Sequence, residues 1–308
     1  MAGGDGRMGA AFRVLLRAAD EGFPGLNGAE FALWGAGFTE ADGPAGVSKE
    51  KGRTVRCKDA ESAVREADAV ILPLPVSRDG IRLNAPGMGD DAPQVTELLG
   101  LMKPGAMVFG GRIPETACEV CRERGLLVTD YFEDEAFQIR NAVPTAEGAV
   151  AACIDTLPVT VAGLSCTVLG YGRVGRTLAR RLSALGAEVT AAARSPRDLA
   201  WAEADGCVPM PLADWRDNPP GHMAVFNTVP ARILEADTLN KMKRGTVLFD
   251  LAPGAEGVRC LRREEAERAG IRVISLPSLP GKCAPETAGE IIGGAVLAAL
   301  AAKEGGSV

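Results

Sequence analysis

The chain has 308 residues, which is long enough for two domains with separate hydrophobic cores. Its 34 lysines and arginines and 40 aspartates and glutamates give a net charge of −6, which argues against a nucleic-acid-binding protein. The sequence has no secretory pattern and no apolar run long enough to span a bilayer, so we expect a cytoplasmic protein that does not contact a membrane.

The N-terminal half alternates helices with strands, which predicts a parallel α/β sheet. It opens with the glycine-rich turn Gly3-Gly4-Asp5-Gly6-Arg7, so the first strand should be missing or very short. A helix is expected next at residues 8–19. Further strands are expected at residues 30–34, 69–72, 106–109 and 127–129, and further helices at 60–66, 95–102 and 114–124. The pattern predicts a flavodoxin-like domain, the substrate domain, over residues 1–143.

A connecting helix should join the two domains. Pro144 suits the first position of a helix, because proline needs no partner for a backbone N–H there. We therefore predict a linking helix over residues 144–157 and a second domain over residues 144–282.

The second domain begins with a strand, a glycine-rich turn and a helix. An apolar run at residues 166–169 precedes Gly170, Gly172 and Gly175, which have the spacing G-x-G-x-x-G. A helix with one apolar face follows, and residues 188–193 form the next expected strand. This context predicts a Rossmann fold that binds a dinucleotide, with the pyrophosphate at the N-terminus of the helix.

The residues after that second strand should distinguish NAD from NADP. NAD sites usually place a carboxylate there, whereas this chain has Arg194, Ser195 and Arg197. Arginine suits a 2′-phosphate, so we predict NADP(H) as the cofactor, with a solvated basic turn as the alternative.

A brief strand at residues 207–208 and three further strands, at residues 222–227, 246–250 and 272–275, complete the predicted sheet. Residues at their carboxyl ends are expected to line the cofactor site. The full set of predicted cofactor-binding residues is Gly170, Gly172, Arg173, Val174, Gly175, Arg194, Ser195, Arg197, Asn227, Thr228, Val229, Pro230, Asp250, Leu251 and Pro280. A C-terminal helix within residues 283–308 is expected to return to the first domain.

No residue stands out as a proton-transfer group. His222 is the only histidine and lies at the start of a predicted strand, at the end away from the cofactor edge, so we interpret it as structural. This argues against the usual 2-hydroxyacid dehydrogenases, which use a histidine. Asp5, Asp134 and Glu147 are the catalytic candidates. Cys118 and Cys121 have zinc-like spacing but no second pair, so we expect no metal.

Several blocks of the chain resemble the A-chain family of dipicolinate synthase, the dehydrogenase-like component of that enzyme. They are the turn at residues 3–7, residues 132–148 with Asn-Ala-Val-Pro-Thr-Ala-Glu-Gly, the fingerprint with Arg194-Ser195, and residues 279–289. These blocks and the strand-end turns supply the substrate-binding candidates Gly4, Asp5, Arg7, Pro73, Pro75, Arg112, Asn141, Thr145 and Lys282.

The resemblance implies a sporulation enzyme with the domain architecture of 2-hydroxyacid and alanine dehydrogenases. It implies action with the flavoprotein-like second component of dipicolinate synthase on a tetrahydro- or dihydrodipicolinate from the lysine pathway, yielding pyridine-2,6-dicarboxylate. The cations at the strand ends suit such a dicarboxylate. We also expect a homo-oligomer. Two alternatives remain: an NADP-dependent keto-acid or imine reductase that needs no partner, and a regulatory protein that binds NADPH without chemistry.

Overall fold

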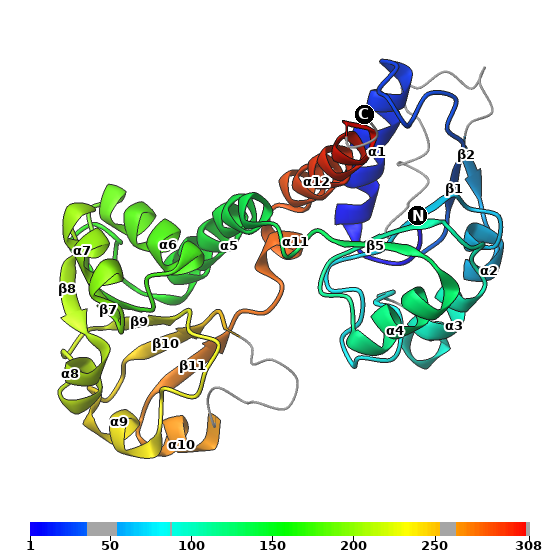
Figure 1. Cartoon of the computed structure of the whole chain (residues 1–308). Helices are drawn as coiled ribbons and strands as arrows, with labels where there is room; N and C mark the ends of the chain where they lie inside the picture. The colour runs from blue at the N-terminus through cyan, green and yellow to red at the C-terminus, as the bar shows by residue number, and fades with distance from the viewer. Residues whose placement is uncertain (36–53, 87, 253–262, 306–308) are drawn as a thin grey trace. The chain divides into compact units, whose positions relative to one another are not determined.

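The computed structural model describes residues 1–35, 54–86, 88–252 and 263–305 (Figure 1). The chain divides into two compact units, Met1–Arg140 with Ala284–Val308 (unit 1) and Asn141–Cys283 (unit 2). The limits predicted from the sequence lie after residues 143 and 282, close to these positions.

Unit 1 is built on parallel strands. They are β1 (Phe31–Leu33), β2 (Thr54–Arg56), β3 (Ala69–Ile71), β4 (Met107–Gly110) and β5 (Leu127–Asp130). β1 pairs with β2, while β4 lies between β3 and β5. The helices are α1 (Gly6–Asp20), α2 (Ala60–Val64), α3 (Val95–Gly100), α4 (Glu115–Arg124), the start of α5 (Glu135–Thr156), and α12 (Pro285–Gly305), with a short 3₁₀ turn, η3 (Gly89–Asp91).

The first residues of the chain connect the two groups of strands. Ala2 forms a parallel bridge with Trp34, next to β1, and its N–H donates to the carbonyl of Ile71 in β3. The expected first strand is therefore very short, and it occupies the position between β1 and β3.

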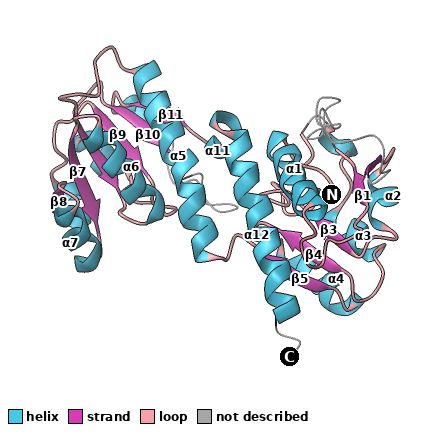
Figure 2. Ribbon diagram, turned by 90° about the horizontal axis from the view of Figure 1, so that it is seen from above, coloured by secondary structure: helices cyan, strands magenta, loops and turns pink. Residues whose placement is uncertain are grey.

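The C-terminal helix α12 packs along α1 (Figure 2). Small residues allow the close approach: a Cβ added at Gly289 would lie 2.3 Å from the carbonyl oxygen of Arg7, and one at Gly293 would lie 2.8 Å from Cβ of Val14. The apolar faces of both helices contribute to the core of unit 1. The returning C-terminal helix thus holds the helix that begins at the glycine-rich turn.

Helix α5 starts earlier than the sequence predicted, which corrects the start expected at Pro144. It begins at Glu135, and Pro144 lies inside it. Asp134 explains the start, because its Oδ1 accepts a hydrogen bond from the backbone N–H of Ala136 at 2.7 Å. Inside the helix Pro144 has no N–H to give to the carbonyl of Arg140, and that missing bond falls at the end of unit 1.

Unit 2 is a single parallel sheet with strand order β11-β10-β9-β6-β7-β8. The strands are β6 (Ser165–Leu169), β7 (Glu188–Ala193), β8 (Val208–Pro211), β9 (Ala224–Asn227), β10 (Val247–Asp250) and β11 (Arg272–Ser275). The helices are α6 (Arg173–Ala184), α7 (Pro196–Ala204), α8 (Leu212–Asp217), α9 (Ala236–Lys241), α10 (Arg263–Arg268) and α11 (Leu279–Cys283), besides the rest of α5.

This strand order is that of a doubly wound Rossmann sheet, so the predicted fold class is confirmed. The chain reverses direction across the sheet between β6 and β9, which are neighbours. Ligands of such sheets bind beyond the carboxyl ends of the strands at that switch point. The glycine-rich turn lies there, because Gly170 directly follows β6.

Candidate functional site

The glycine-rich turn of unit 2 is shaped by contacts that only glycine permits. Gly170 has φ +88°, and a Cβ there would lie 2.7 Å from Oγ1 of Thr228. A Cβ at Gly175 would lie 2.0 Å from the carbonyl oxygen of Gly170, so helix and strand could not pack as they do. Gly172 differs, because a Cβ there would meet nothing within 4 Å. The first and third glycines pack the turn, and the middle one leaves its backbone open to a ligand.

The N-terminus of α6 has the properties of an anion site. Its N-cap is Gly172, which supplies no side-chain hydrogen bond, and its first turn contains no acidic residue. The first backbone N–H groups of a helix lack intrahelical partners and lie at the positive end of the helix dipole. A pyrophosphate beside Gly172 fits this arrangement.

Polar side chains at the carboxyl ends of β9 and β10 lie next to the glycine-rich turn. Oγ1 of Thr228 donates to the carbonyl of Leu169 at 2.8 Å, which ties β9 to the glycine-rich turn. Nδ2 of the buried Asn227 donates to Oδ1 of Asp250 at 2.9 Å, and Oδ1 of Asn227 accepts from the N–H of Val229 at 3.1 Å. Burial raises the pKa of Asp250, although the hydrogen bond from Asn227 opposes the shift.

The basic turn after β7 is open to solvent. Arg194 and Arg197 are exposed, and within the described part of the chain neither has a hydrogen bond or an ion pair. Ser195 is the N-cap of α7, and its hydroxyl makes no capping bond. These groups are available to a phosphate, and their selection of NADP(H) stays a prediction.

Other predicted cofactor residues are spread over unit 2. Val174 is half-buried in α6, Leu251 follows β10, and Pro230 is exposed after β9. Pro280 is buried in α11. Arg173 is the first residue of α6.

In unit 1, Asp5 and Arg7 form an ion pair. Nε of Arg7 donates to Oδ1 of Asp5 at 2.8 Å, Nη2 donates to Oδ2 at 2.8 Å, and Nη2 also donates to the carbonyl of Leu74 at 2.6 Å. The Arg7 side chain is 5% exposed and that of Asp5 26%. Burial raises the pKa of Asp5, but Arg7 outweighs it and holds the pKa below the ordinary value. Arg7 is thus occupied within the protein, and its predicted substrate contact stays a prediction.

The turn after β3 adjoins this pair, because its Leu74 carbonyl accepts from Arg7. Gly4 has φ +91°, and a Cβ there would lie 3.2 Å from Cβ of the buried Pro73. The carbonyl of Pro75 accepts a hydrogen bond from Nδ2 of Asn84 at 3.0 Å. These predicted substrate residues lie together at the strand ends.

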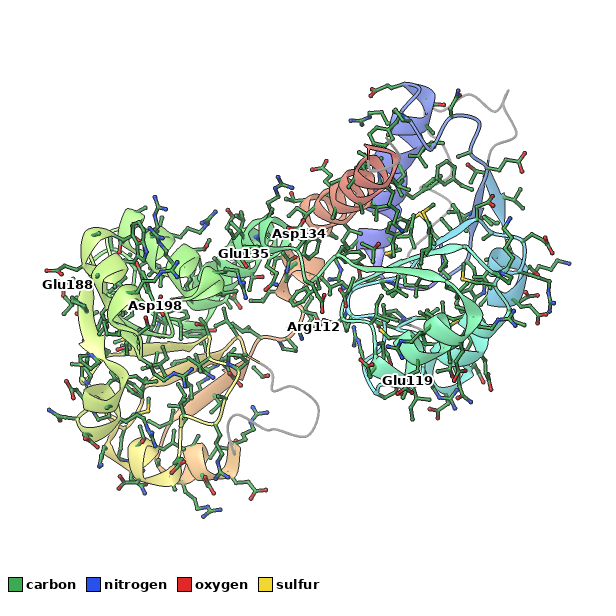
Figure 3. All side chains as sticks on the ribbon, in the orientation of Figure 1. Arg112, Glu119, Asp134, Glu135, Glu188 and Asp198 are labelled. Carbon is green, nitrogen blue, oxygen red and sulfur yellow. The ribbon has the colours of Figure 1, made fainter. Side chains whose placement is uncertain are left out.

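Arg112 is an exposed cation at this edge. It has φ +55°, which is uncommon for a residue other than glycine, and its Cζ lies 4.4 Å from the ring centroid of Phe132. Asp130 fixes the backbone of the turn after β4 and of the residues after β5. Its carboxylate accepts from the N–H groups of Arg112, Ile113 and Phe132. Figure 3 labels Arg112 in the loop after β4. The guanidinium has no ion pair among the described residues, so it can receive a carboxylate.

The candidates on α5 and α11 have other surroundings. Asp134 caps α5, and Figure 3 shows it beside the start of that helix. Oε1 of Glu147 accepts from Nη2 of Arg181 in α6 at 3.2 Å. Oγ1 of Thr145 donates to the carbonyl of Asn141 at 2.8 Å. Lys282 is exposed in α11. The catalytic role of Asp134 or Glu147 stays a prediction.

His222 lies beside the amino ends of the strands. Its Nδ1 is 2.8 Å from Oγ1 of Thr167, and burial lowers its pKa. Its backbone carbonyl accepts from Oγ1 of Thr246, just before β10. This position lies away from the glycine-rich turn.

The described ranges offer neither a metal cluster nor a membrane span. No group of three or more His, Cys, Asp or Glu side chains there could hold a metal ion. Burial raises the pKa of Cys121 to about 11, which keeps it a thiol. No described helix is both long and apolar enough to cross a membrane.

Sequence reasoning missed Asp130 and Asp205. The carboxylate of Asp205 binds Tyr171 and Arg176, which flank the open Gly172. No local motif marks either aspartate, because Asp205 acts on residues far from it in the sequence, and Asp130 holds Arg112 and Ile113 across 18 and 17 positions besides its near neighbour Phe132. The only signal was a carboxylate at the end of a predicted strand, in the case of Asp130.

Comparisons with known proteins agree with this geometry. Residues 26–132 match the family model that describes the N-terminal domain of the dipicolinate synthase A chain. Residues 147–256 match the model described as D-isomer specific 2-hydroxyacid dehydrogenase, NAD binding domain. Unit 2 is therefore a dehydrogenase-type domain for a nicotinamide nucleotide.

Individual relatives extend over most of the chain. The dipicolinate synthase A chain of Bacillus subtilis (strain 168) is 29% identical over 256 residues, 82% of this chain and 84% of the relative. The crystal structure of the A chain of dipicolinate synthase from Bacillus subtilis has a TM-score of 0.79 at 25% identity, covering 99% and 96% of the two chains. An L-alanine dehydrogenase shares the fold, with a TM-score of 0.62 at 16% identity over 97% and 85%. The resemblance to the A-chain family of dipicolinate synthase is thus confirmed.

Proposed function

We propose that this relative of the dipicolinate synthase A chain is an NADP-dependent dehydrogenase that oxidises dihydrodipicolinate to pyridine-2,6-dicarboxylate during spore formation. The observation that carries the proposal is the match of residues 26–132 to a family model specific to that protein. The open anion site at Gly172 supports the nucleotide part of the proposal.

The proposed reaction removes one hydride and one proton from the dihydropyridine ring. NADP⁺ supplies the hydride acceptor when bound, and the ring becomes aromatic. The chain's own residues bind and orient: the N-terminus of α6 holds the pyrophosphate, and Arg194 holds the 2′-phosphate. Arg112 is free to bind one substrate carboxylate.

Three carboxylates remain as candidates for the proton acceptor. The lowered pKa of Asp5 makes its carboxylate a weaker base than an ordinary aspartate. Asp134 accepts a helix-capping bond, and Glu147 is paired with Arg181. Activity measurements on variants of the three would assign the role.

We propose that the chain acts in the cytoplasm as a homo-oligomer, together with the flavoprotein-like second component of dipicolinate synthase. Support comes from the names of the relatives, which denote one chain of a larger enzyme. The absence of an evident catalytic histidine on the predicted cofactor edge fits an enzyme that needs a second component.

The test is to incubate the chain with NADP⁺ and 4-hydroxy-tetrahydrodipicolinate, which gives dihydrodipicolinate by loss of water, with and without the flavoprotein-like component. We expect pyridine-2,6-dicarboxylate and NADPH to appear in equal amounts, and only when both proteins are present. A Gly172→Asp variant is the negative control for cofactor binding, because it puts a carboxylate at the open anion site. Full activity of the chain alone, or its turnover of simple keto acids and imines, would favour the reductase alternative. NADPH binding without hydride transfer would favour the regulatory alternative.

A further inference from the structure

A polar cluster adjoins the glycine-rich turn of unit 2. Tyr171 lies between Gly170 and Gly172, and its hydroxyl donates to Oδ2 of Asp205 at 3.0 Å. Nε of Arg176 in α6 donates to the same oxygen at 2.7 Å, and its Nη2 donates to Oδ1 at 3.3 Å. We call Tyr171, Arg176 and Asp205 the Asp205 brace.

Asp205 and Tyr171 are shielded from water, whereas the side chain of Arg176 is 32% exposed and lies against α7. The side chain of Asp205 is 12% exposed, and Tyr171 is 4% exposed within the core of unit 2. Cζ of Arg176 lies 4.0 Å from the ring centroid of Trp201. Charge-assisted hydrogen bonds gain strength where water is excluded, which here applies to the Asp205 end of the brace.

The protonation states of the brace match its hydrogen bonds. The hydrogen bond from Arg176 lowers the pKa of Asp205. Burial raises the pKa of Tyr171, so the phenol keeps the proton that it donates. Asp205 is therefore a carboxylate that accepts from two donors at neutral pH.

In the sequence, the two donors flank the residues of the anion site. Tyr171 immediately precedes Gly172, and Arg176 lies in the first half of α6, where its N–H donates to the carbonyl of Gly172 at 2.9 Å. The open backbone N–H groups lie between them. Glycine loses much conformational freedom when it is ordered, so a turn already fixed before binding saves that cost.

We propose that Asp205 is a positioning residue for the pyrophosphate of the dinucleotide, holding the glycine-rich turn in its binding shape through Tyr171 and Arg176. This inference rests on the proposed nucleotide-binding function. Because the pyrophosphate is common to both cofactors, Asp205 acts equally on NADP(H) and NAD(H). In this respect it differs from Arg194, which acts on the 2′-phosphate alone.

The test uses the full-length chain and the variants Asp205→Asn and Tyr171→Phe. We expect Asp205→Asn to weaken both NADPH and NADH binding about tenfold, the usual scale for one charged hydrogen bond. Tyr171→Phe keeps the ring and should weaken both about threefold, as a neutral hydrogen bond does. Competition by adenosine 2′-monophosphate, which has no pyrophosphate, should stay unchanged.

Arg181→Gln is the matched control, because it breaks an ion pair on the same helix far from the anion site. It should leave both affinities unchanged. If Asp205→Asn binds both cofactors within twofold of wild type and only its melting temperature is lower, the inference is overturned. Asp205 then stabilises the fold without positioning the pyrophosphate. A loss confined to NADPH would overturn it as well. If the wild-type chain binds neither dinucleotide, the proposed function fails together with it. Should Asp205→Asn not fold, Tyr171→Phe decides by the same criteria.

Discussion

The first helix of unit 1 begins at a carboxylate, whereas the helix after the glycine-rich turn of unit 2 begins at a glycine. Asp5 caps α1 and accepts from the N–H of Arg7. Gly172 caps α6 and offers no side chain. Both turns are rich in glycine and both follow a strand position, yet only the second leaves helix N–H groups free for an anion.

One arginine from each unit shows the same contrast. Arg7 is buried and bonded to Asp5 and Leu74, while Arg194 is exposed with no partner in the described residues. An arginine in a turn is therefore a ligand-binding candidate only when no nearby carboxylate already holds it. Variants in each unit test how far the two differ in this way.

The largest expected effect is on the stability of unit 1. Arg7→Met removes the cation and leaves Asp5 without its partner, which should cost about 3 kcal/mol of unfolding free energy. Urea denaturation measures it. The affinity for NADPH should not change, because the predicted phosphate site lies in unit 2.

A double variant controls for the lost packing. Asp5→Asn with Arg7→Met removes both charges and keeps an N-cap residue, so most of the stability should return. If Arg7→Met instead unfolds like wild type and only the substrate KM rises, Arg7 is a substrate ligand as first predicted from the sequence.

The next effect concerns the choice of cofactor in unit 2. Arg194→Ala should cost about 2–3 kcal/mol of NADP(H) binding, up to roughly a hundredfold in affinity, and change NAD(H) binding little. Arg268→Ala, an exposed arginine of α10, is the control. Equal wild-type affinities for the two cofactors, or equal losses in the variant, would show that Arg194 is a solvated turn residue.

The sequence predicted the local features of the molecule better than the distant ones. The fingerprint from β6 to β7 follows from neighbouring residues, and so could be read directly. Asp205 could not be found in this way, because only the folded sheet brings it to Tyr171 and Arg176. The burial of Arg7 could not be predicted from the sequence either, since it depends on Leu74 and on the packing of α12.

The prediction of where α5 starts was wrong for a different reason. Proline is common at the first position of a helix, and this preference placed the start at Pro144. The capping bond that Asp134 accepts from Ala136 and the apolar contacts of Phe137 outweigh the bond that Pro144 cannot make. Asp134 followed by Glu135 and Ala136 is itself a helix-start pattern, so the signal was present.

A smaller effect is expected where α12 supports α1. Gly289→Ala adds a Cβ that would lie 2.3 Å from the carbonyl of Arg7, so the helices must separate at a cost of about 2 kcal/mol. Gly294→Ala is the matched control, because a Cβ there meets nothing within 4 Å, and it should stabilise α12 slightly. Thermal unfolding of both variants measures the difference. Equal melting temperatures would show that α12 does not hold the N-terminal turn of unit 1.

The smallest effect is a pH dependence, and it should have opposite signs in the two units. Burial raises the pKa of Asp250, so between the ordinary aspartate value, about 3.9, and its folded-state value the folded protein holds the extra proton. Its contribution to stability therefore falls as pH rises through that window. For Asp5 burial is outweighed by Arg7, and the folded-state pKa lies below the ordinary value. Its contribution is complete above the ordinary value and is lost as pH falls toward the folded-state value.

Asparagine at either position removes the titration, so the variants isolate the two contributions. The stability of Asp250→Asn relative to wild type should rise with increasing pH, because the wild type then carries a half-buried charge that the variant lacks. The relative stability of Asp5→Asn should fall with increasing pH, because the wild type then gains its ion pair with Arg7. Urea unfolding at a series of pH values gives both curves. If both slope in the same direction, the two carboxylates have similar surroundings, and the contrast between the ion-paired Asp5 and the half-buried Asp250, which has no cation as partner among the described residues, does not hold.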